Sequence, residues 1–332
     1  MINRKIVLVS RPDGYPKVDD FKLIEESVPE LGDDQVLLAA EHLSIDAFIQ
    51  TTLDGDPGFH GTMELNTPVV ALGVARVVES RFDGLNQGDA VFGPIGAQTH
   101  LVGPGNMFRK LQEDAAPARA YLGALGMTTG LTAYAGMISV GEVAQSDTVA
   151  VSAAAGAVGS VACQLARIKG AKVIGIAGGP EKVDYVVNTL GCDAGIDYKS
   201  DDVRAKLAEL APDGINVFFD NVGGEILDDV LDNITKGARV VICGAISQYD
   251  DLSSVRGPNL YLRLAERNSS MRGFTVDTFA ADFPAMEADI AGWMSAGELT
   301  LPEHIVEGID NFPEALTLLF NGGHKGKLLV AP

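Results

Sequence analysis

A run of small residues at positions 152–160, SAAAGAVGS, has the spacing of a turn that holds phosphate. It places Ala154, Gly156 and Gly159 as a G-x-G-x-x-G motif with alanine first. Gly156 would let the backbone approach a pyrophosphate, and Gly159 would let the following helix pack on the preceding strand. The amide groups that open that helix would carry partial positive charge toward the anion. The turn therefore predicts binding of a nicotinamide dinucleotide, and a tight turn without ligand is the alternative.

The end of the next expected strand bears on the choice between NAD and NADP. NAD sites place an acid there, about 20 residues after the glycine motif, to bind the ribose 2′-hydroxyl. This chain has Gly178 and Gly179 instead, and Lys182 follows where an ammonium would meet a 2′-phosphate. The pattern favours NADPH. Glu181 keeps NAD open, because the flexible glycine pair would let its carboxylate reach the ribose.

The elements that must position this turn alternate between short β-branched runs and helical patterns over residues 141–244. A strand at 148–152 precedes the turn, and apolar residues recur at helical spacing from Val158 to Ala166. Further strands are expected at 172–177, 194–198, 217–220 and 239–243, and further helices at 181–190, 202–210 and 225–234. This alternation predicts a doubly wound parallel sheet, the Rossmann type of α/β fold.

The first 120 residues differ, with glycine-punctuated strands and little helical periodicity. The C-terminal stretch, with a helix near 313–320 and a strand at 327–330, is expected to rejoin that first part. A chain of 332 residues is long enough for two domains. We therefore expect a mostly β domain of residues 1–122 and 301–332, and a dinucleotide-binding domain of residues 123–300.

Composition excludes several classes of protein. Hydrophobic residues make up 46% and charged residues 21%, which is typical of globular proteins. A formal net charge of -20 disfavours nucleic acid and anionic membrane surfaces as partners. No apolar stretch approaches the roughly 18 residues of a membrane helix, and the N-terminal apolar run is too short for a signal peptide. We expect a cytoplasmic protein.

The cysteines argue against a metal. Cys163, Cys192 and Cys243 form no C-x-x-C pair, and residues 1–141 contain no cysteine at all. The three histidines of that region, His42, His60 and His100, have no metal-ligand spacing. The ligand count thus excludes a catalytic zinc held by Cys and His, and no metal site is expected. Hydride addition to a conjugated carbonyl needs only hydrogen-bond donors for the oxygen, so an enone fits better than a plain alcohol.

Five segments together have the pattern of one family: LGALGMTTGLTAY (122–134), VSAAAGAVGSV (151–161), GCDAGIDYKS (191–200), FDNVGGEILD (219–228) and CGAISQY (243–249). With them the chain resembles the zinc-independent medium-chain dehydrogenase/reductases of the leukotriene B4 12-hydroxydehydrogenase, prostaglandin reductase and curcumin reductase group. The resemblance implies a GroES-like first domain, a Rossmann second domain, a homodimer, and NADPH-dependent reduction of the carbon–carbon double bond of α,β-unsaturated ketones and aldehydes.

The resemblance also implies roles for individual residues. Our hypothesis for the mechanism makes Tyr249 catalytic: Tyr249 and the cofactor ribose hydroxyl would stabilise the substrate oxygen, and Tyr249 or water would protonate the α-carbon. A tyrosine that caps its loop is the simpler interpretation. The cofactor would contact Met127, Thr128, Gly156, Ala157, Val158, Gly159, Lys182, Tyr198, Asn221, Cys243, Gly244, Ala245, Ile246, Ser247, Phe274, Thr275, Val276 and His324.

Three segments depart from the family. The usual D-P-Y-M-R is Asp46-Ala47-Phe48-Ile49-Gln50 here, and the terminal N-x-G-K is His324-Lys325-Gly326-Lys327. Residues 53–66 are LDGDPGFHGTMELN, where the family tends to carry prolines and a tyrosine. These differences leave the substrate open. They also leave two alternative functions: an NADPH:quinone reductase, and a non-catalytic NADPH-binding redox sensor or structural protein.

Overall fold

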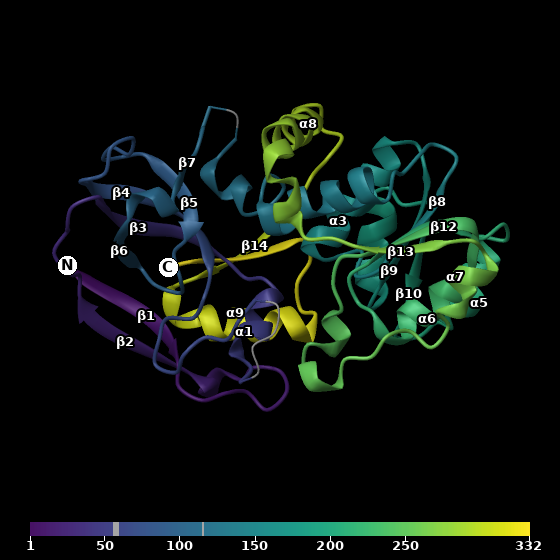
Figure 1. The fold of residues 1–332 in the computed structure, drawn as a ribbon, viewed down its shortest axis with the longest axis horizontal. Coiled ribbons are helices and arrows are strands. Elements are labelled where there is room, and N and C mark those ends of the chain that lie inside the picture. Colours follow the sequence, from purple (N-terminus) through teal and green to yellow (C-terminus); the bar gives the residue numbers. More distant parts are fainter. Residues whose placement is uncertain (56–59, 115) are drawn as a thin grey trace. The chain divides into compact units, whose positions relative to one another are not determined.

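The computed structural model describes residues 1–55, 60–114 and 116–332. It divides into two compact units, one of residues 1–123 with 303–332 and one of residues 124–302 (Figure 1). We call them unit 1 and unit 2. Part of the 53–66 segment, which departs from the family, falls outside the described residues.

Unit 1 is built on a seven-stranded sheet. Its strands run in the order β14 (Glu303–Glu307), β15 (Lys327–Ala331), β3 (Gln35–Ser44), β4 (Leu72–Ser80), β5 (Ala90–Pro94) and β7 (Arg109–Lys110), with β6 (His100–Pro104) paired to β3. A separate antiparallel pair consists of β1 (Ile2–Leu8) and β2 (Phe21–Ser27). Because β15 pairs antiparallel with β3, the end of the chain returns to the sheet of unit 1.

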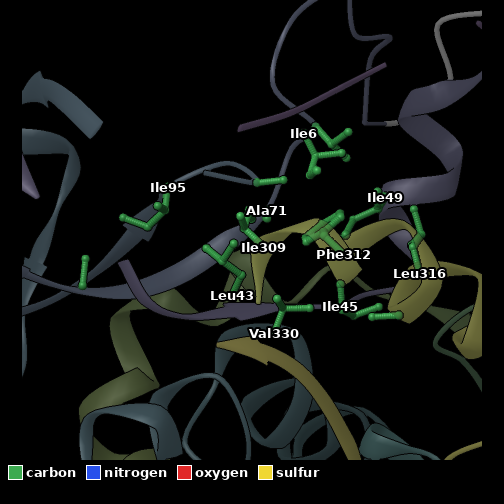
Figure 2. Close-up of a cluster of buried hydrophobic side chains, with 14 of the residues drawn as sticks. Ile6, Leu43, Ile45, Ile49, Ala71, Ile95, Ile309, Phe312, Leu316 and Val330 are labelled. Atoms are coloured by element: carbon green, nitrogen blue, oxygen red, sulfur yellow. The ribbon is translucent and has the colours of Figure 1, made fainter. Parts of the chain in front are cut away.

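The core of unit 1 is formed by apolar residues that are far apart in the chain. Figure 2 shows Ile6, Ile49, Phe312 and Val330 in one apolar cluster, and each is at most 1% exposed. Alternate strand residues point to this cluster, as the period of a β-strand requires. Two helices pack on it, α1 (Phe48–Leu53) and α9 (Phe312–Asn321). Short 3₁₀ turns complete the unit: Val18–Asp20, Gly105–Met107, Ala118–Tyr121 and Ile309–Asn311.

Helix α1 was not predicted from the sequence. It has only six residues, so it is too short for a helical period to show. Its polar residues are tied to its own backbone, since the hydroxyl of Thr51 donates to the carbonyl of Phe48 at 2.7 Å and that of Thr52 to Ile49 at 2.7 Å. The helix follows directly on Asp46, so the altered family segment forms its first turn.

Unit 2 holds a six-stranded, all-parallel sheet, which confirms the α/β fold. The strand order is β10 (Ala194–Asp197), β9 (Lys172–Ala177), β8 (Thr148–Val151), β11 (Ile215–Asp220), β12 (Ile234–Ile242) and β13 (Ser270–Gly273). The α-helices are α2 (Thr132–Tyr134), α3 (Ala157–Ile168), α4 (Pro180–Asp184), α5 (Val203–Leu210), α6 (Gly224–Asp232), α7 (Leu262–Glu266) and α8 (Phe283–Ser295). Wider π-helical turns cover Met127–Leu131, Ala135–Val140 and Tyr185–Thr189, and 3₁₀ turns cover Ile246–Gln248, Leu252–Ser254 and Val276–Asp282.

Helices cover both faces of this sheet (Figure 1). Ala150 of β8 belongs to the cluster that contains Leu207 of α5 and Leu231 of α6. Its neighbours Val149 and Val151 are also buried, and because side chains alternate along a strand they face the opposite side of the sheet. Strands buried on both faces explain why these segments read as continuous apolar runs.

Two predicted boundaries were wrong. The helix expected at 225–234 ends at Asp232, and Ile234 begins β12, which the sequence placed no earlier than Arg239. The reason lies in tertiary structure, because Ile234 is buried and pairs with Ile215 of β11.

Within the described residues, no helix is both long and apolar enough to cross a bilayer.

Candidate functional site

The predicted phosphate turn lies between β8 and α3 in unit 2. Gly156 precedes the first helical residue, so Ala157, Val158 and Gly159 form the first turn of α3 with amide groups that have no partner within the helix. A side chain on Gly159 would place its Cβ 2.2 Å from the carbonyl oxygen of Ala153. Glycine is therefore required there for the close approach of helix and strand.

Gly178 and Gly179, the glycine pair that follows β9, contact residues at the end of β10 and in the turn after it. A Cβ on Gly178 would lie 2.8 Å from the ring of Tyr198, so the missing side chain leaves room for that ring. Gly179 has φ 92°, a backbone conformation that favours glycine, and its N–H donates to Oδ1 of Asp197 at 2.7 Å. These contacts lower the pKa of Asp197, because backbone N–H groups stabilise its charged form. Lys182 follows in the first turn of α4.

The end of β11 carries a buried carboxylate, Asp220, which sequence reasoning did not single out. Its Oδ1 accepts hydrogen bonds from the hydroxyl of Ser152 at 2.8 Å and the N–H of Val222 at 2.9 Å. Burial raises its pKa despite these bonds. Asn221 is fixed beside it, since its amide donates to the carbonyl of Ser152 at 2.7 Å. The aspartate of the FDNVGG segment was the available signal, and its role is to join the ends of β8 and β11.

The loop after β12 is attached to the same carboxylate residue. The N–H groups of Cys243 and Gly244 donate to the backbone carbonyl of Asp220 at 2.8 and 3.1 Å. Further along, the N–H of Ala245 donates to the phenolic oxygen of Tyr249 at 3.2 Å. The loop thus closes on itself and holds the tyrosine near its own start.

Burial decides which groups of this loop can ionise. It raises the pKa of Tyr249 above the ordinary 10.0, so the phenol keeps its proton at neutral pH. It raises the pKa of the Cys243 thiol to about 12, so this cysteine is not a nucleophile. The remaining loop residues are fixed by the turn after β11: the N–H of Ile246 donates to Asn221 at 3.1 Å, and the hydroxyl of Ser247 donates to Val222 at 2.6 Å.

Phe274 follows β13 and packs on the helical segment that begins at Met127. A Cβ on Gly136 would lie 2.8 Å from the ring of Phe274, so this glycine permits the contact. The π-helical turn Met127–Leu131 contains Thr128, and the hydroxyl of Thr132 donates to the carbonyl of Met127 at 2.7 Å. Such widened turns inside helices are often found at functional sites. Thr275 and Val276 continue the chain after Phe274, and Thr275 is hydrogen-bonded to Thr278 at 3.1 Å.

Apart from Met127 and Thr128, the predicted residues of unit 2 thus follow the carboxyl ends of parallel strands, where ligands bind in open α/β sheets. Comparison with known proteins also indicates an oxidoreductase. A family model described as the N-terminal domain of oxidoreductases matches residues 4–111, and one described as a zinc-binding dehydrogenase matches residues 157–292.

Relatives match along nearly the whole chain. The NADPH-dependent curcumin reductase of Escherichia coli (strain K12) is 32% identical over 99% of this chain and 96% of its own length. The chain belongs to the zinc-independent medium-chain dehydrogenase/reductases. The NADP(+)-dependent 2-alkenal reductase of Nicotiana tabacum is 34% identical over 99% of this chain and 97% of its own length. The crystal structure of CurA from Vibrio vulnificus in complex with NADPH has a TM-score of 0.93 at 34% identity, and the match covers 99% of this chain and 98% of that one.

The residues of this dehydrogenase/reductase chain fit a dinucleotide phosphate. Gly156 and Gly159 leave the α3 turn without side chains, and no acid stands at Gly178 or Gly179, where a carboxylate would repel a 2′-phosphate. Among the described residues, no three or more His, Cys, Asp or Glu side chains are grouped so that they could hold a metal ion.

In unit 1 the segments that depart from the family lie against each other. Lys327 is bonded to Asp46 through a 2.6 Å contact between Nζ and Oδ1. Gln50 is buried in α1, and its amide donates to the carbonyl of Gly14 at 3.1 Å. His324 is buried, with 7% of its surface exposed, three residues before Lys327. The structure therefore brings together residues 46–50 and 324–327, two segments that are far apart in the sequence.

Proposed function

We propose that this chain uses NADPH to reduce the carbon–carbon double bond of α,β-unsaturated ketones or aldehydes. The observation that carries the proposal is the row of glycines, Asn221 and the Tyr249 loop at the carboxyl ends of β8, β9, β11 and β12. Curcumin and 2-alkenal reductases are among its relatives of at least 30% identity, and the CurA structure contains NADPH. The chain is an NADP-dependent oxidoreductase of conjugated carbonyl compounds.

The cofactor contacts that we propose are those of the family pattern. They comprise Met127, Thr128, Gly156, Ala157, Val158, Gly159, Lys182, Tyr198, Asn221, Cys243, Gly244, Ala245, Ile246, Ser247, Phe274, Thr275, Val276 and His324. The support for the unit 2 members other than Met127 and Thr128 is their shared position after the strand ends. The support for Met127 and Thr128 is the family pattern. The support for His324 is the family pattern alone. We propose that unit 2 binds the cofactor.

When bound, NADPH supplies the hydride that forms the new bond at the β-carbon of the substrate. The chain must then stabilise negative charge on the carbonyl oxygen and provide a proton for the α-carbon. Tyr249 suits both tasks, because its raised pKa keeps the phenol protonated and its oxygen already accepts the N–H of Ala245. That bond leaves the phenolic hydrogen available to donate. One hydride and one proton convert the double bond into a single bond, so the reaction balances.

We propose that the altered segment of unit 1, residues 46–50, forms a wall against the substrate. Phe48 occupies the position of the family tyrosine and Gln50 that of the arginine, so the wall has lost a hydroxyl and a positive charge. We propose that this wall favours conjugated substrates without a carboxylate, because a guanidinium is the usual partner for one. Turnover of a phenyl-substituted enone and of its carboxylate analogue would compare the two classes.

Two alternative functions are separated by product and turnover. A quinone reductase would yield a hydroquinone or semiquinone, and a sensor or structural protein would bind NADPH and oxidise none of it. The experiment is loss of reduced-nicotinamide absorbance over a panel from short alkenals to diarylheptanoids, with NADPH and NADH compared. Oxidation of NADPH with an enone supports the proposal. Oxidation only with quinones, or none, rejects it.

We also propose a homodimer. Strand β13 is the last strand of its sheet, with β12 as its one neighbour in the strand order. Nearby in the chain, Tyr261 and Leu262 are 60% and 58% exposed, which is unusual for large apolar side chains. Light scattering would give twice the mass of the chain for a dimer.

We propose a cytoplasmic location. All three cysteines are free thiols, and free thiols are typical of reducing compartments. Cell fractionation tests this assignment.

A further inference from the structure

The turn that follows β10 folds back over the end of β9. A Cβ on Gly178 would lie 2.8 Å from Cε1 of Tyr198 and 3.0 Å from Cε of Lys199. The last methylene of the Lys199 side chain therefore lies across the glycine that replaces the acid of NAD sites. Its ammonium is bonded to that methylene, so a positive charge stands beside Gly178.

This arrangement is fixed through the backbone. Oδ1 of Asp197 accepts the N–H of Gly179 at 2.7 Å and the N–H of Lys199 at 3.1 Å. The backbone N–H of Asp197 donates to Oδ2 of Asp201 at 2.9 Å, which closes the turn. One carboxylate thus holds the glycine pair and the lysine together, although they come from different strands.

Charges of both signs lie around this point. Lys182 approaches from α4 and Lys199 from the β10 turn, and the same segments carry the acids Glu181, Asp184, Asp197 and Asp201. Asp197 directs Oδ1 at two backbone N–H groups. Lys199 is exposed and forms no salt bridge with the residues that the structure describes; after the backbone hydrogen bonds, its charge contributes to the lowered pKa of Asp197. Its ammonium is therefore available to a ligand.

We propose that Lys199 is a second cationic contact for the 2′-phosphate and thereby determines the preference for NADPH over NADH. A dianionic phosphate beside Gly178 would be bracketed by two ammonium groups from two elements. The inference rests on the proposed function, in which Lys182 and Tyr198 flank that phosphate. Asp197 is a positioning residue, because its carboxylate binds the backbone N–H groups of Gly179 and Lys199.

Equilibrium binding of adenosine 2′,5′-bisphosphate and of 5′-AMP tests the assignment without turnover. Lys199→Ala is expected to weaken binding of the bisphosphate about tenfold, the loss typical of a charge-assisted contact, and to change 5′-AMP binding less than about twofold. Lys199→Arg should restore most of the affinity, since it keeps the charge. Lys236→Ala, which removes an exposed lysine from β12, is the matched control and should change neither affinity.

Lys182→Ala separates this inference from the proposed function. If Lys182→Ala weakens bisphosphate binding and Lys199→Ala does not, the role of Lys199 is wrong and the proposed phosphate site stands. If neither variant weakens it, the proposed site falls as well. Unchanged melting temperatures for both variants are expected, because both substitutions are at residues that are not buried. A loss that is equal for the bisphosphate and for 5′-AMP would also overturn the inference.

Discussion

The ammonium of Lys327 lies 2.6 Å from a carboxylate oxygen of Asp46, and the two side chains are 1% and 8% exposed. The second carboxylate oxygen accepts the hydroxyl of Ser44. A pair this deeply buried is costly to separate, because either charge alone would remain in an apolar surrounding. It attaches the start of β15 to the segment that leads into α1.

Lys327→Met should therefore destabilise the protein by about 3–5 kcal/mol, measured by urea unfolding. The double variant Lys327→Met, Asp46→Asn should recover more than half of that loss, because no unpaired charge remains. A loss below about 1 kcal/mol for the single variant would contradict the buried pair.

Gly159→Ala and Gly156→Ala should affect different properties. A Cβ at Gly159 would clash with the backbone of Ala153 at 2.2 Å, whereas one at Gly156 would lie 3.2 Å from the same oxygen. Gly159→Ala should cost about 1–3 kcal/mol of stability, typical of overpacking. Gly156→Ala should keep its stability and lose NADPH affinity, because the added methyl lies where the pyrophosphate is proposed. Equal stability of both variants would reject this distinction.

Ala153→Gly should stabilise the protein. Ala153 has φ 49°, the left-handed region, in the turn between β8 and α3. This conformation costs an L-residue roughly 1–2 kcal/mol, and glycine adopts it freely. We expect a gain of about 0.5–1 kcal/mol in thermal or urea unfolding after the entropy of the unfolded glycine is included. A loss of stability would show that the turn is held by another contact.

Tyr249→Phe should lower kcat with an enone about 100-fold, as for loss of an acid or oxyanion donor. Burial holds the folded-state pKa above 10.0. The active form is protonated, so the rate should be flat at neutral pH and fall only as pH rises through that raised pKa. Tyr261→Phe, which changes an exposed tyrosine, is the control and should keep wild-type kcat. Retained activity in Tyr249→Phe would remove the tyrosine from the mechanism.

The sequence predicted the parts of the fold that follow from local pattern. The strand at 172–177 and the turn at 152–160 were placed correctly, because buried parallel strands and glycine motifs leave a strong signal. The start of β12 was not, because it depends on pairing between Ile234 and Ile215. Helix α1 escaped because six residues carry no period.

The site was predictable where a motif names its residues and not where it depends on contacts over long distances in sequence. Asp46 and Lys327 are 281 residues apart, and nothing in either segment indicates a partner. In the sequence, Asp220 is only one residue of the FDNVGG motif, and nothing there shows that it connects the ends of β8, β11 and β12. In the sequence, nothing distinguishes Lys199 from an ordinary surface lysine, because its position beside Gly178 depends on the folded structure.

The central claim is hydride addition to the β-carbon of a conjugated carbonyl. The most direct measurement uses NADPH deuterated at the transferable position, one equivalent of an enone, and NMR of the product. The account predicts a saturated ketone with deuterium at the β-carbon and one NADP⁺ formed for each ketone. An allylic alcohol with deuterium at the carbonyl carbon, or unchanged enone with NADPH intact, would contradict it.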